Sequence, residues 1–359
     1  MSTQSQTANE ISWPQLGIRP ILLLALLLVL GVMVVLSLAL GSVQIPLDEI
    51  VTILTGGEPT RATWATIVMN FRLPKTLTAV LAGSALAISG LQMQTLFRNP
   101  LAGPFVLGIN SGASLGVALV VLSVGTATGG LLSALGLFGN FGIILAASLG
   151  SALVLFAVMA VAHRVNNMTL LILGLLFGYA TSAVVSVLLY FAIAERIQAY
   201  IAWTFGSFAG VTWSQLQVLA PAVLAALAMA WISAKPLNAL LLGETYARSL
   251  GLTVRRARFF ILTSASILAG AVTVFCGPIV FIGVAVPHLC RSLFNSSDHR
   301  VLVPATIMMG AIVALTADLI AQLPGSQTIL PLNAVTALIG APVVAWVILR
   351  KRNLKATFG

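Results

Sequence analysis

The sequence predicts an all-α, polytopic membrane protein. Hydrophobic residues make up 59% of the 359 residues, charged residues only 7%, and the mean hydropathy is +1.07. Water-soluble domains have roughly a quarter of their residues charged. Apolar runs of about 20 residues recur along the chain, and each is long enough to cross roughly 30 Å of hydrocarbon. A transmembrane barrel is excluded, because its strands would alternate over about ten residues.

Nine apolar runs are clear, and each is expected to form a spanning helix. They cover residues 20–41, 76–97, 105–124, 138–162, 168–194, 215–234, 259–277, 301–323 and 329–349. The first run is too long for the core of a secretory signal and no small-residue cleavage site follows it, so we expect a retained helix. A tenth run, 278–290, is short and contains Pro287, and its periodicity does not decide whether it crosses.

The distribution of cations decides the number of crossings. Cytoplasmic loops of membrane proteins are enriched in Lys and Arg. Arg19 precedes the first run and four cations follow the last, so both termini are expected in the cytoplasm and the number of crossings is even. Ten crossings leave only Arg61, Arg72, Lys75 and Arg196 of the 18 cations outside. The same bias accounts for the net charge of +10, and no basic run is long enough to indicate a nucleic-acid partner.

The chain is therefore predicted to contain a cytoplasmic N-terminal tail (1–19), a transmembrane domain (20–350) and a cytoplasmic C-terminal tail (351–359). Within the transmembrane domain, residues 235–258 form the longest cytoplasmic loop, with two short helical stretches broken near Gly243 and Gly251. Such an amphipathic element is suited to a groove in a partner protein, although a solvated loop explains the pattern equally well.

Two features indicate close packing inside the bundle. A short crossing that contains proline frees backbone groups that lipid cannot satisfy, so 278–290 should pack within the protein or line a polar cavity. Broken helices of this kind are typical of transport pathways, and we favour a pathway over a scaffold for this segment.

In the third run, Gly108, Gly112 and Gly116 recur every fourth residue, and we expect a neighbouring backbone to approach this glycine face closely.

The sequence indicates a transporter without its own energy source. It contains no G-x-x-x-x-G-K-[ST] phosphate loop, and it shows no catalytic arrangement or metal-ligand spacing. Asp318 is the only acidic residue within an apolar run, which is weak support for coupling to protons or sodium. Two alternatives remain open at this point: an ion-coupled secondary carrier and a purely structural membrane anchor.

Several long blocks of the sequence resemble the FecCD type of iron-chelate and cobalamin permeases. They are RLPKTLTAVLAGSALAISGLQMQTLFRNPLAGPFVLGINSGASLG at 72–116, LLLGETYARSLGL at 240–252, GPIVFIGVAVPHLCR at 277–291, DHRVLVPATIMMGAIVALTAD at 298–318 and LPLNAVTALIGAPVVAWVIL at 330–349. The blocks follow the order of the family and span nearly all of the chain beyond the N-terminal tail.

The resemblance implies ten transmembrane helices in the fold of type II ABC importer permeases, located in the bacterial cytoplasmic (inner) membrane. It implies a second permease subunit, identical or a sibling, and two ATP-binding subunits that hold ATP and Mg, so this chain is expected to bind no cofactor and to perform no catalysis. A periplasmic protein or a lipoprotein would deliver the ligand. The positions that match the family's coupling helices, which seat in the ATPases, are Gly243, Glu244, Ala247, Leu250 and Gly251.

The same resemblance suggests roles for two further groups. Arg72 and Lys75 match a motif whose cations receive glutamates of the binding protein, although relatives often have Arg where this chain has Lys75. Asn166, Asn167 and Met168 occupy a cytoplasmic constriction where relatives carry small polar residues, so Met168 departs from the pattern. His288 follows Pro287 in a pair common to the family, which argues against a metal-ligand role.

The expected substrate is an iron chelate, with ferric siderophores favoured and haem or cobalamin as alternatives. Such cargo is bulky, so the pathway should be wide and mostly apolar. The sequence therefore says little about which chelate passes.

Overall fold

The computed structural model describes residues 18–122, 140–162, 164–323 and 329–350, and within these ranges the chain is a bundle of helices without strands. Each of the ten predicted runs coincides with an apolar helix. These are α1 (Ile18–Ala39), α4 (Leu73–Leu96), α5 (Ile109–Leu122), α7 (Asn140–Ala162), α8 (Asn167–Tyr190), α10 (Trp213–Ile232), α13 (Val254–Cys276), α14 (Phe281–Phe294), α15 (His299–Gln322) and α16 (Leu332–Arg350).

Seven of these helices are long and apolar enough to cross a membrane by themselves. The other three predicted crossings correspond to shorter apolar helices, Ile109–Leu122, Phe281–Phe294 and Leu332–Ala345. The count of ten crossings therefore stays a prediction. Residues 1–17 of the predicted N-terminal tail (1–19) and the whole predicted C-terminal tail (351–359) lie outside the described residues, whereas residues 18 and 19 begin α1.

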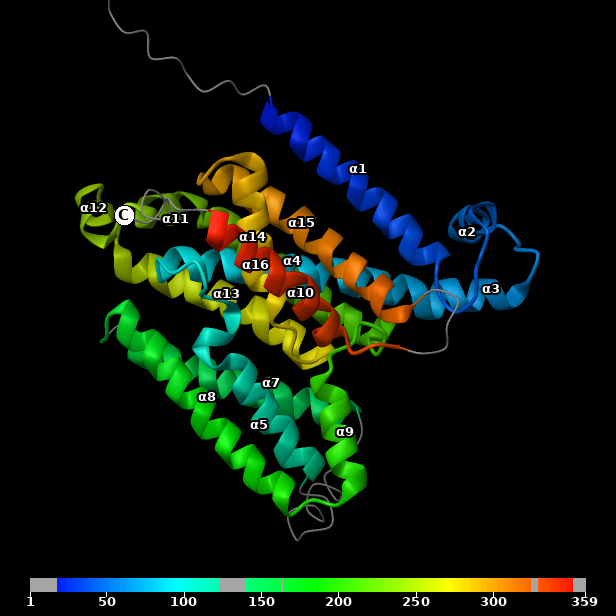
Figure 1. The fold of residues 1–359 in the computed structure, drawn as a ribbon, viewed down its shortest axis with the longest axis horizontal. Helices are drawn as coiled ribbons and strands as arrows, with labels where there is room; N and C mark the ends of the chain where they lie inside the picture. Colours follow the sequence, from blue (N-terminus) through cyan, green and yellow to red (C-terminus); the bar gives the residue numbers. More distant parts are fainter. Residues whose placement is uncertain (1–17, 123–139, 163, 324–328, 351–359) are drawn as a thin grey trace, which may run out of the picture.

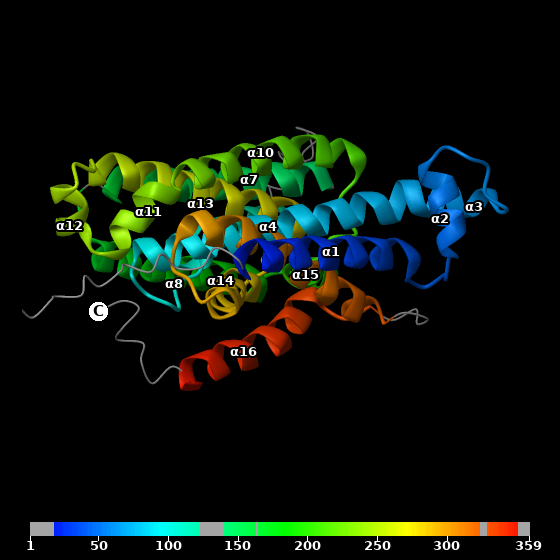
Figure 2. The same cartoon turned by 90° about the horizontal axis from the view of Figure 1, so that it is seen from above.

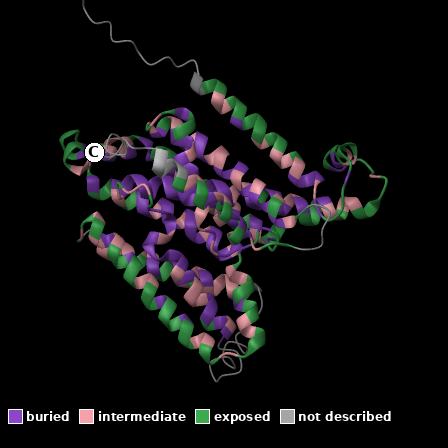
Figure 3. Cartoon of the chain, viewed as in Figure 1, coloured by how far each residue is buried: buried purple, intermediate pink, exposed green. Residues whose placement is uncertain are grey.

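Helix α4 forms the centre of the bundle, with α10, α13, α14 and α15 packed around it (Figures 1 and 3). Small residues allow the backbones to meet: a Cβ on Gly83 would overlap the carbonyl of Gly310 in α15, and a Cβ on Gly90 would overlap Gly283 in α14. Without a hydrophobic driving force between helices in lipid, such close contacts provide much of the packing energy.

Polar side chains of α4 hydrogen-bond to carbonyls of its neighbours. Ser84 Oγ donates to Ile307 O (2.9 Å), and Ser89 Oγ donates to Ala265 O (2.8 Å). These groups would each cost several kcal/mol if they were buried without a partner in hydrocarbon. The polar residues of α4 therefore fix the positions of α13 and α15 around it.

The short crossing predicted at 278–290 is α14, and most of its residues are buried against α4, α15 and α16. Pro287 lies inside this helix. Gln94 on α4 donates to Val284 O (3.1 Å) and accepts a hydrogen bond from Arg291 Nη1 (2.6 Å). The prediction that this crossing packs within the protein is confirmed. Its place in a transport pathway stays a prediction.

A second group of helices, α5, α7, α8 and α9 (Ala194–Thr204), lies to one side of the α4 core (Figure 1). Gly112 and Gly116 of α5 contact the backbone of Gly150 and Ala146 in α7, as the glycine spacing predicted. Gly108 is not part of this helical face, and here the prediction is wrong. It ends the short 3-10 helix η2 (Pro104–Leu107) with φ of 73°, a left-handed conformation that favours glycine.

The two ends of the bundle carry different short elements (Figure 2). One end holds α2 (Leu47–Leu54), α3 (Ala62–Thr66) and the π-helix η1 (Ile67–Arg72), which leads into α4. The opposite end holds α11 (Ala234–Leu241) and α12 (Glu244–Ser249). Helix α1 runs toward the α2–α3 end, whereas α16 runs toward the α11–α12 end, so the chain enters and leaves the bundle from the same side.

Candidate functional site

The loop predicted to dock onto a partner forms two short helices, α11 and α12, separated and ended by glycines. Gly243 has φ of 102° and Gly251 has φ of 81°, values that side-chain-bearing residues rarely adopt. Residues 254–258 of the predicted loop, 235–258, form the first turns of α13, which begins at Val254. The first turns of α13 carry Arg255, Arg256 and Arg258, and these charges hid the start of the helix from the apolar pattern.

The loop has an inner and an outer face. Leu237, Leu240 and Ala247 are buried and pack the loop onto the bundle. Tyr246 and Leu250 are exposed large side chains at the outer surface, 48% and 60% exposed. Of the predicted coupling residues, Leu250 therefore faces outward and Ala247 faces the chain's own core. An exposed apolar surface next to polar residues is typical of a protein-binding site.

Glu244 turns inward and connects α12 to two other helices. Its Oε1 accepts hydrogen bonds from Arg258 Nη2 of α13 (2.6 Å) and from Asn167 Nδ2 of α8 (3.1 Å). Its Oε2 pairs with Arg248 (3.3 Å), which is mostly exposed. Arg258 also donates to Ala162 O (2.9 Å) at the end of α7. One carboxylate thus joins the short helix α12 to the ends of α7, α8 and α13.

The predicted gate residues lie beside this carboxylate. Asn166 caps α8, its Oδ1 accepting from Thr169 N (2.8 Å). Asn167 reaches the coupling loop through Glu244 and also donates to Leu96 O at the end of α4 (2.8 Å). Met168 is 68% exposed and does not share these contacts. The structure therefore brings Asn167 and the coupling residue Glu244 together, a link that the sequence analysis did not make.

A second polar cluster attaches α11 to the core. Asn238 Nδ2 donates to Asp298 Oδ1 (2.7 Å), and Asn238 Oδ1 accepts from His299 Nδ1 (2.7 Å). His299 Nε2 lies 2.9 Å from Thr95 Oγ1 on α4. Burial tends to raise the pKa of Asp298, but hydrogen bonds from Arg300 N and Asn238 outweigh it and hold that pKa below its ordinary value. Sequence reasoning missed this cluster because its members lie far apart along the chain.

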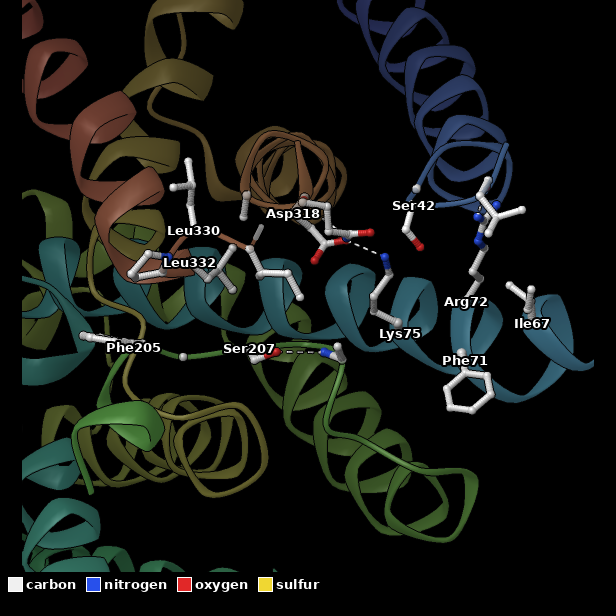
Figure 4. Close-up of a pocket in the computed structure, with 18 residues that line it drawn as sticks. Ser42, Ile67, Phe71, Arg72, Lys75, Phe205, Ser207, Asp318, Leu330 and Leu332 are labelled. Atoms are coloured by element: carbon white, nitrogen blue, oxygen red, sulfur yellow. Dashed lines mark hydrogen bonds and ion pairs between the residues drawn. The ribbon is translucent and has the colours of Figure 1, made fainter. Parts of the chain in front are cut away.

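At the α2–α3 end, a cavity of about 570 Å³ opens between α1, η1, α15 and the start of α16 (Figure 4). Arg72, Lys75 and Asp318 line it together with apolar side chains, among them Phe71 and Leu330. Both predicted docking cations therefore face one pocket.

Both cations are already engaged within the chain. The Arg72 guanidinium donates to Leu38 O (2.6 Å), Ala39 O (2.9 Å) and Val43 O. Lys75 Nζ lies 3.1 Å from Asp318 Oδ2, and both side chains are only 8% exposed. Asp318 is therefore one half of a buried ion pair. Binding of a partner's carboxylates by Arg72 and Lys75 stays a prediction, and it would have to compete with these contacts.

The described residues contain no group of three or more His, Cys, Asp and Glu side chains that could hold a metal ion. His288 Nε2 lies 2.7 Å from Pro100 O, which places this ring in a backbone contact.

Comparison with known proteins agrees with this arrangement. The sequence profile of the FecCD transport family matches residues 25–350. The chain belongs to the FecCD transport family. Membership makes it a permease of an ABC importer and a multi-pass protein of the inner membrane.

Two curated relatives of this permease cover nearly its whole length. The vitamin B12 import system permease protein BtuC of Klebsiella pneumoniae is 39% identical over 92% of this chain and 94% of its own. The hemin transport system permease protein HmuU of Yersinia pestis is 36% identical over 94% of this chain and 98% of its own. A solved inward-facing conformation of a metal-chelate type ABC transporter aligns with a TM-score of 0.80 and 27% identity, over 92% of this chain and 99% of its own.

Proposed function

We propose that this chain is the transmembrane subunit of an importer powered by separate ATP-binding subunits, with the α11–α12 end in the cytoplasm. The positive-inside rule supports this orientation, because Lys235, Arg248, Arg255, Arg256 and Arg258 gather at that end. The pocket with Arg72 and Lys75 then faces the outside.

The observation that carries the proposal is the two-faced loop of α11 and α12. Its outer face exposes Tyr246 and Leu250, and its inner face is tied by Glu244 to helices that run through the membrane. The chain itself contains no phosphate loop. A force applied to the outer face by a nucleotide-binding partner would therefore be passed to the bundle.

The contact at Glu244 provides a route for that force. When the ATP-binding subunits close, α12 would be displaced, and Glu244 would move against Asn167 and so against the start of α8. Asn167 Oδ1 and Arg258 Nε are buried without a hydrogen-bond partner among the described residues, so the junction is incompletely satisfied as it stands. A contact of this kind is suited to two alternative arrangements, which alternating access requires.

The proposed cargo is a bulky metal chelate, with ferric siderophores as the first candidate from the sequence. The names of the two relatives favour a second candidate, a corrin or porphyrin such as cobalamin or haem. A delivering protein would dock at the outer pocket, where its carboxylates would compete with Asp318 for Lys75.

Uptake by cells that express the complete importer tests the proposal. Radiolabelled ferric siderophore, haem and cobalamin are offered singly and in competition, with a strain lacking the ATP-binding subunit as control. We expect one chelate to accumulate and its uptake to vanish in the control strain. Uptake that survives without the ATP-binding subunit but collapses with the proton gradient would indicate an ion-coupled carrier instead. Asp318 argues against that class, because its charge is already paired with Lys75.

A further inference from the structure

A second cavity, of about 330 Å³, lies at the α11–α12 end and is separate from the outer pocket. It forms a slot between the last turn of α7 and the first turns of α13, with α12 at its mouth. Its ionisable lining residues are Glu244, Arg248, Arg255 and Arg258. Three cations against one carboxylate make this slot electropositive.

The carboxylate of Glu244 pairs with Arg248 and Arg258, one at each oxygen. Arg255 makes no hydrogen bond or ion pair with any residue that the structure describes, and its side chain is exposed. Among the described residues, the slot therefore presents a guanidinium without a hydrogen-bond partner, and this group has five donors and a planar fork suited to phosphate.

The other wall of the slot is apolar. Met159, Phe259 and Leu262 line it, and Phe259 is 53% exposed. Phe156, one turn before Met159 on α7, is also exposed. A cationic mouth above an apolar wall fits a ligand with an anionic head and a hydrocarbon tail.

We propose that this slot binds an anionic phospholipid, with its phosphate on Arg255 and Arg248 and an acyl chain along Phe259 and α7. Basic pockets between spanning helices at the cytoplasmic side suit anionic headgroups. A soluble anion would leave the apolar wall unused. An ATP-binding subunit would meet Tyr246 and Leu250 on the outer face of α12, and neither of these lines the slot.

Adjacent arginines on α13 give a matched pair of variants for a test. Arg256 has the same charge and sits one residue from Arg255, but it faces a different cavity and lies over the ring of Phe260, 5.9 Å from its centroid. Both arginine side chains are exposed, so neither substitution removes a buried contact. Size-exclusion chromatography of the full-length variants in detergent checks that both remain folded.

The measurement is equilibrium binding of short-chain phosphatidylglycerol and phosphatidylcholine to the full-length chain in detergent. We expect tighter binding of phosphatidylglycerol, a loss of about fivefold in its affinity for Arg255→Gln, and a change of less than about twofold for Arg256→Gln. Equal losses in both variants, or equal binding of the two lipids, would overturn the proposal, since either indicates a diffuse basic surface.

A third variant separates a lipid from free phosphate. Phe259→Ser should weaken binding of phosphatidylglycerol while leaving binding of inorganic phosphate unchanged. If this variant has no effect on phosphatidylglycerol and inorganic phosphate displaces the lipid readily, the slot is a simple anion site and the lipid proposal fails. Binding is measured on the chain alone, so the result does not depend on the proposed transport function.

Discussion

Asn167 at the start of α8 and Glu244 at the start of α12 are joined by a hydrogen bond of 3.1 Å, although 77 residues separate them in the chain. Asn167 also donates to Leu96 O at the end of α4. A single amide thus connects the loop that faces the predicted ATPase with the central helix and with the predicted gate helix. Displacing α12 without moving α8 would break this bond.

The first prediction concerns the charge of Glu244. Glu244→Gln keeps the size of the side chain but removes the charge that pairs with Arg258, whose side chain is only 12% exposed. Loss of a charged hydrogen bond should weaken anchoring of the loop by about 1.5–3 kcal/mol. We expect uptake to fall several-fold while the ATP-binding subunits still co-purify, measured in cells and by affinity pull-down.

Arg248→Gln is the matched control for this variant, because Arg248 pairs with the same carboxylate but is 66% exposed. Exposed ion pairs of this kind contribute at most about 1 kcal/mol to the free energy of unfolding. If the two variants reduced uptake equally, the inward contacts of Glu244 would not be what couples α12 to transport.

The second prediction concerns the turn at Gly251, where φ is 81°. Proline is confined to φ near −65°, so Gly251→Pro should abolish uptake and association with the ATP-binding subunits while the protein remains inserted. An added Cβ would meet nothing within 4 Å, so Gly251→Asn, which tolerates this conformation, should retain most activity. Co-purification of the proline variant with the ATPase would refute the coupling assignment.

The third prediction concerns the contact between α4 and α15. Gly83→Ala would place a methyl group against Gly310 O and Ala314, and overpacking of this kind costs about 1–3 kcal/mol. The midpoint of thermal unfolding in detergent should fall. Gly31→Ala in α1 is the control, since its Cβ meets nothing within 4 Å and alanine favours helix. A lower midpoint for Gly31→Ala alone would contradict the assigned packing.

The fourth prediction concerns the buried pair of Lys75 and Asp318. Lys75→Met leaves Asp318 without its cation, and such an uncompensated charge destabilises by about 3–5 kcal/mol. Adding Asp318→Asn removes the orphaned charge, so the double variant should recover most of the stability. Unfolding by denaturant measures the stability of the single and the double variant. If the double variant is as unstable as the single one, the orphaned charge of Asp318 is not the cause of the instability.

The same double variant tests docking at the outer pocket. Charge reversal at Lys75 would set two carboxylates against each other and confuse folding with binding, whereas the double variant removes the cation without leaving a buried charge. If Lys75 receives a carboxylate of the binding protein, affinity in nanodiscs should fall by about tenfold, as for loss of a charged contact. Unchanged affinity would remove Lys75 from the docking site.

Much of the bundle could be predicted from the sequence because spanning helices need long apolar runs. The glycine breaks at Gly243 and Gly251 were also predictable, since few other residues adopt those conformations. The start of α13 was missed because Arg255, Arg256 and Arg258 interrupt the apolar pattern without interrupting the helix. Helix α9 was missed because its mixed composition resembles a loop.

The partners of the candidate site residues could not be predicted in the same way. Lys75 and Asp318 are brought together by the packing of α4 on α15, and nothing local in either stretch signals the other. Gly108 shares the spacing of Gly112 and Gly116, yet the proline-led turn before it takes Gly108 out of the helix. Periodicity describes one helix at a time, whereas these contacts depend on how helices meet.

Reconstitution into liposomes tests the central claim most directly. The purified chain is incorporated alone or together with its ATP-binding subunits, and internal accumulation of the labelled chelate is measured with ATP or with an imposed proton gradient. We predict uphill accumulation only when the ATP-binding subunits and ATP are both present. Uphill accumulation by the chain alone under a proton gradient would contradict the account.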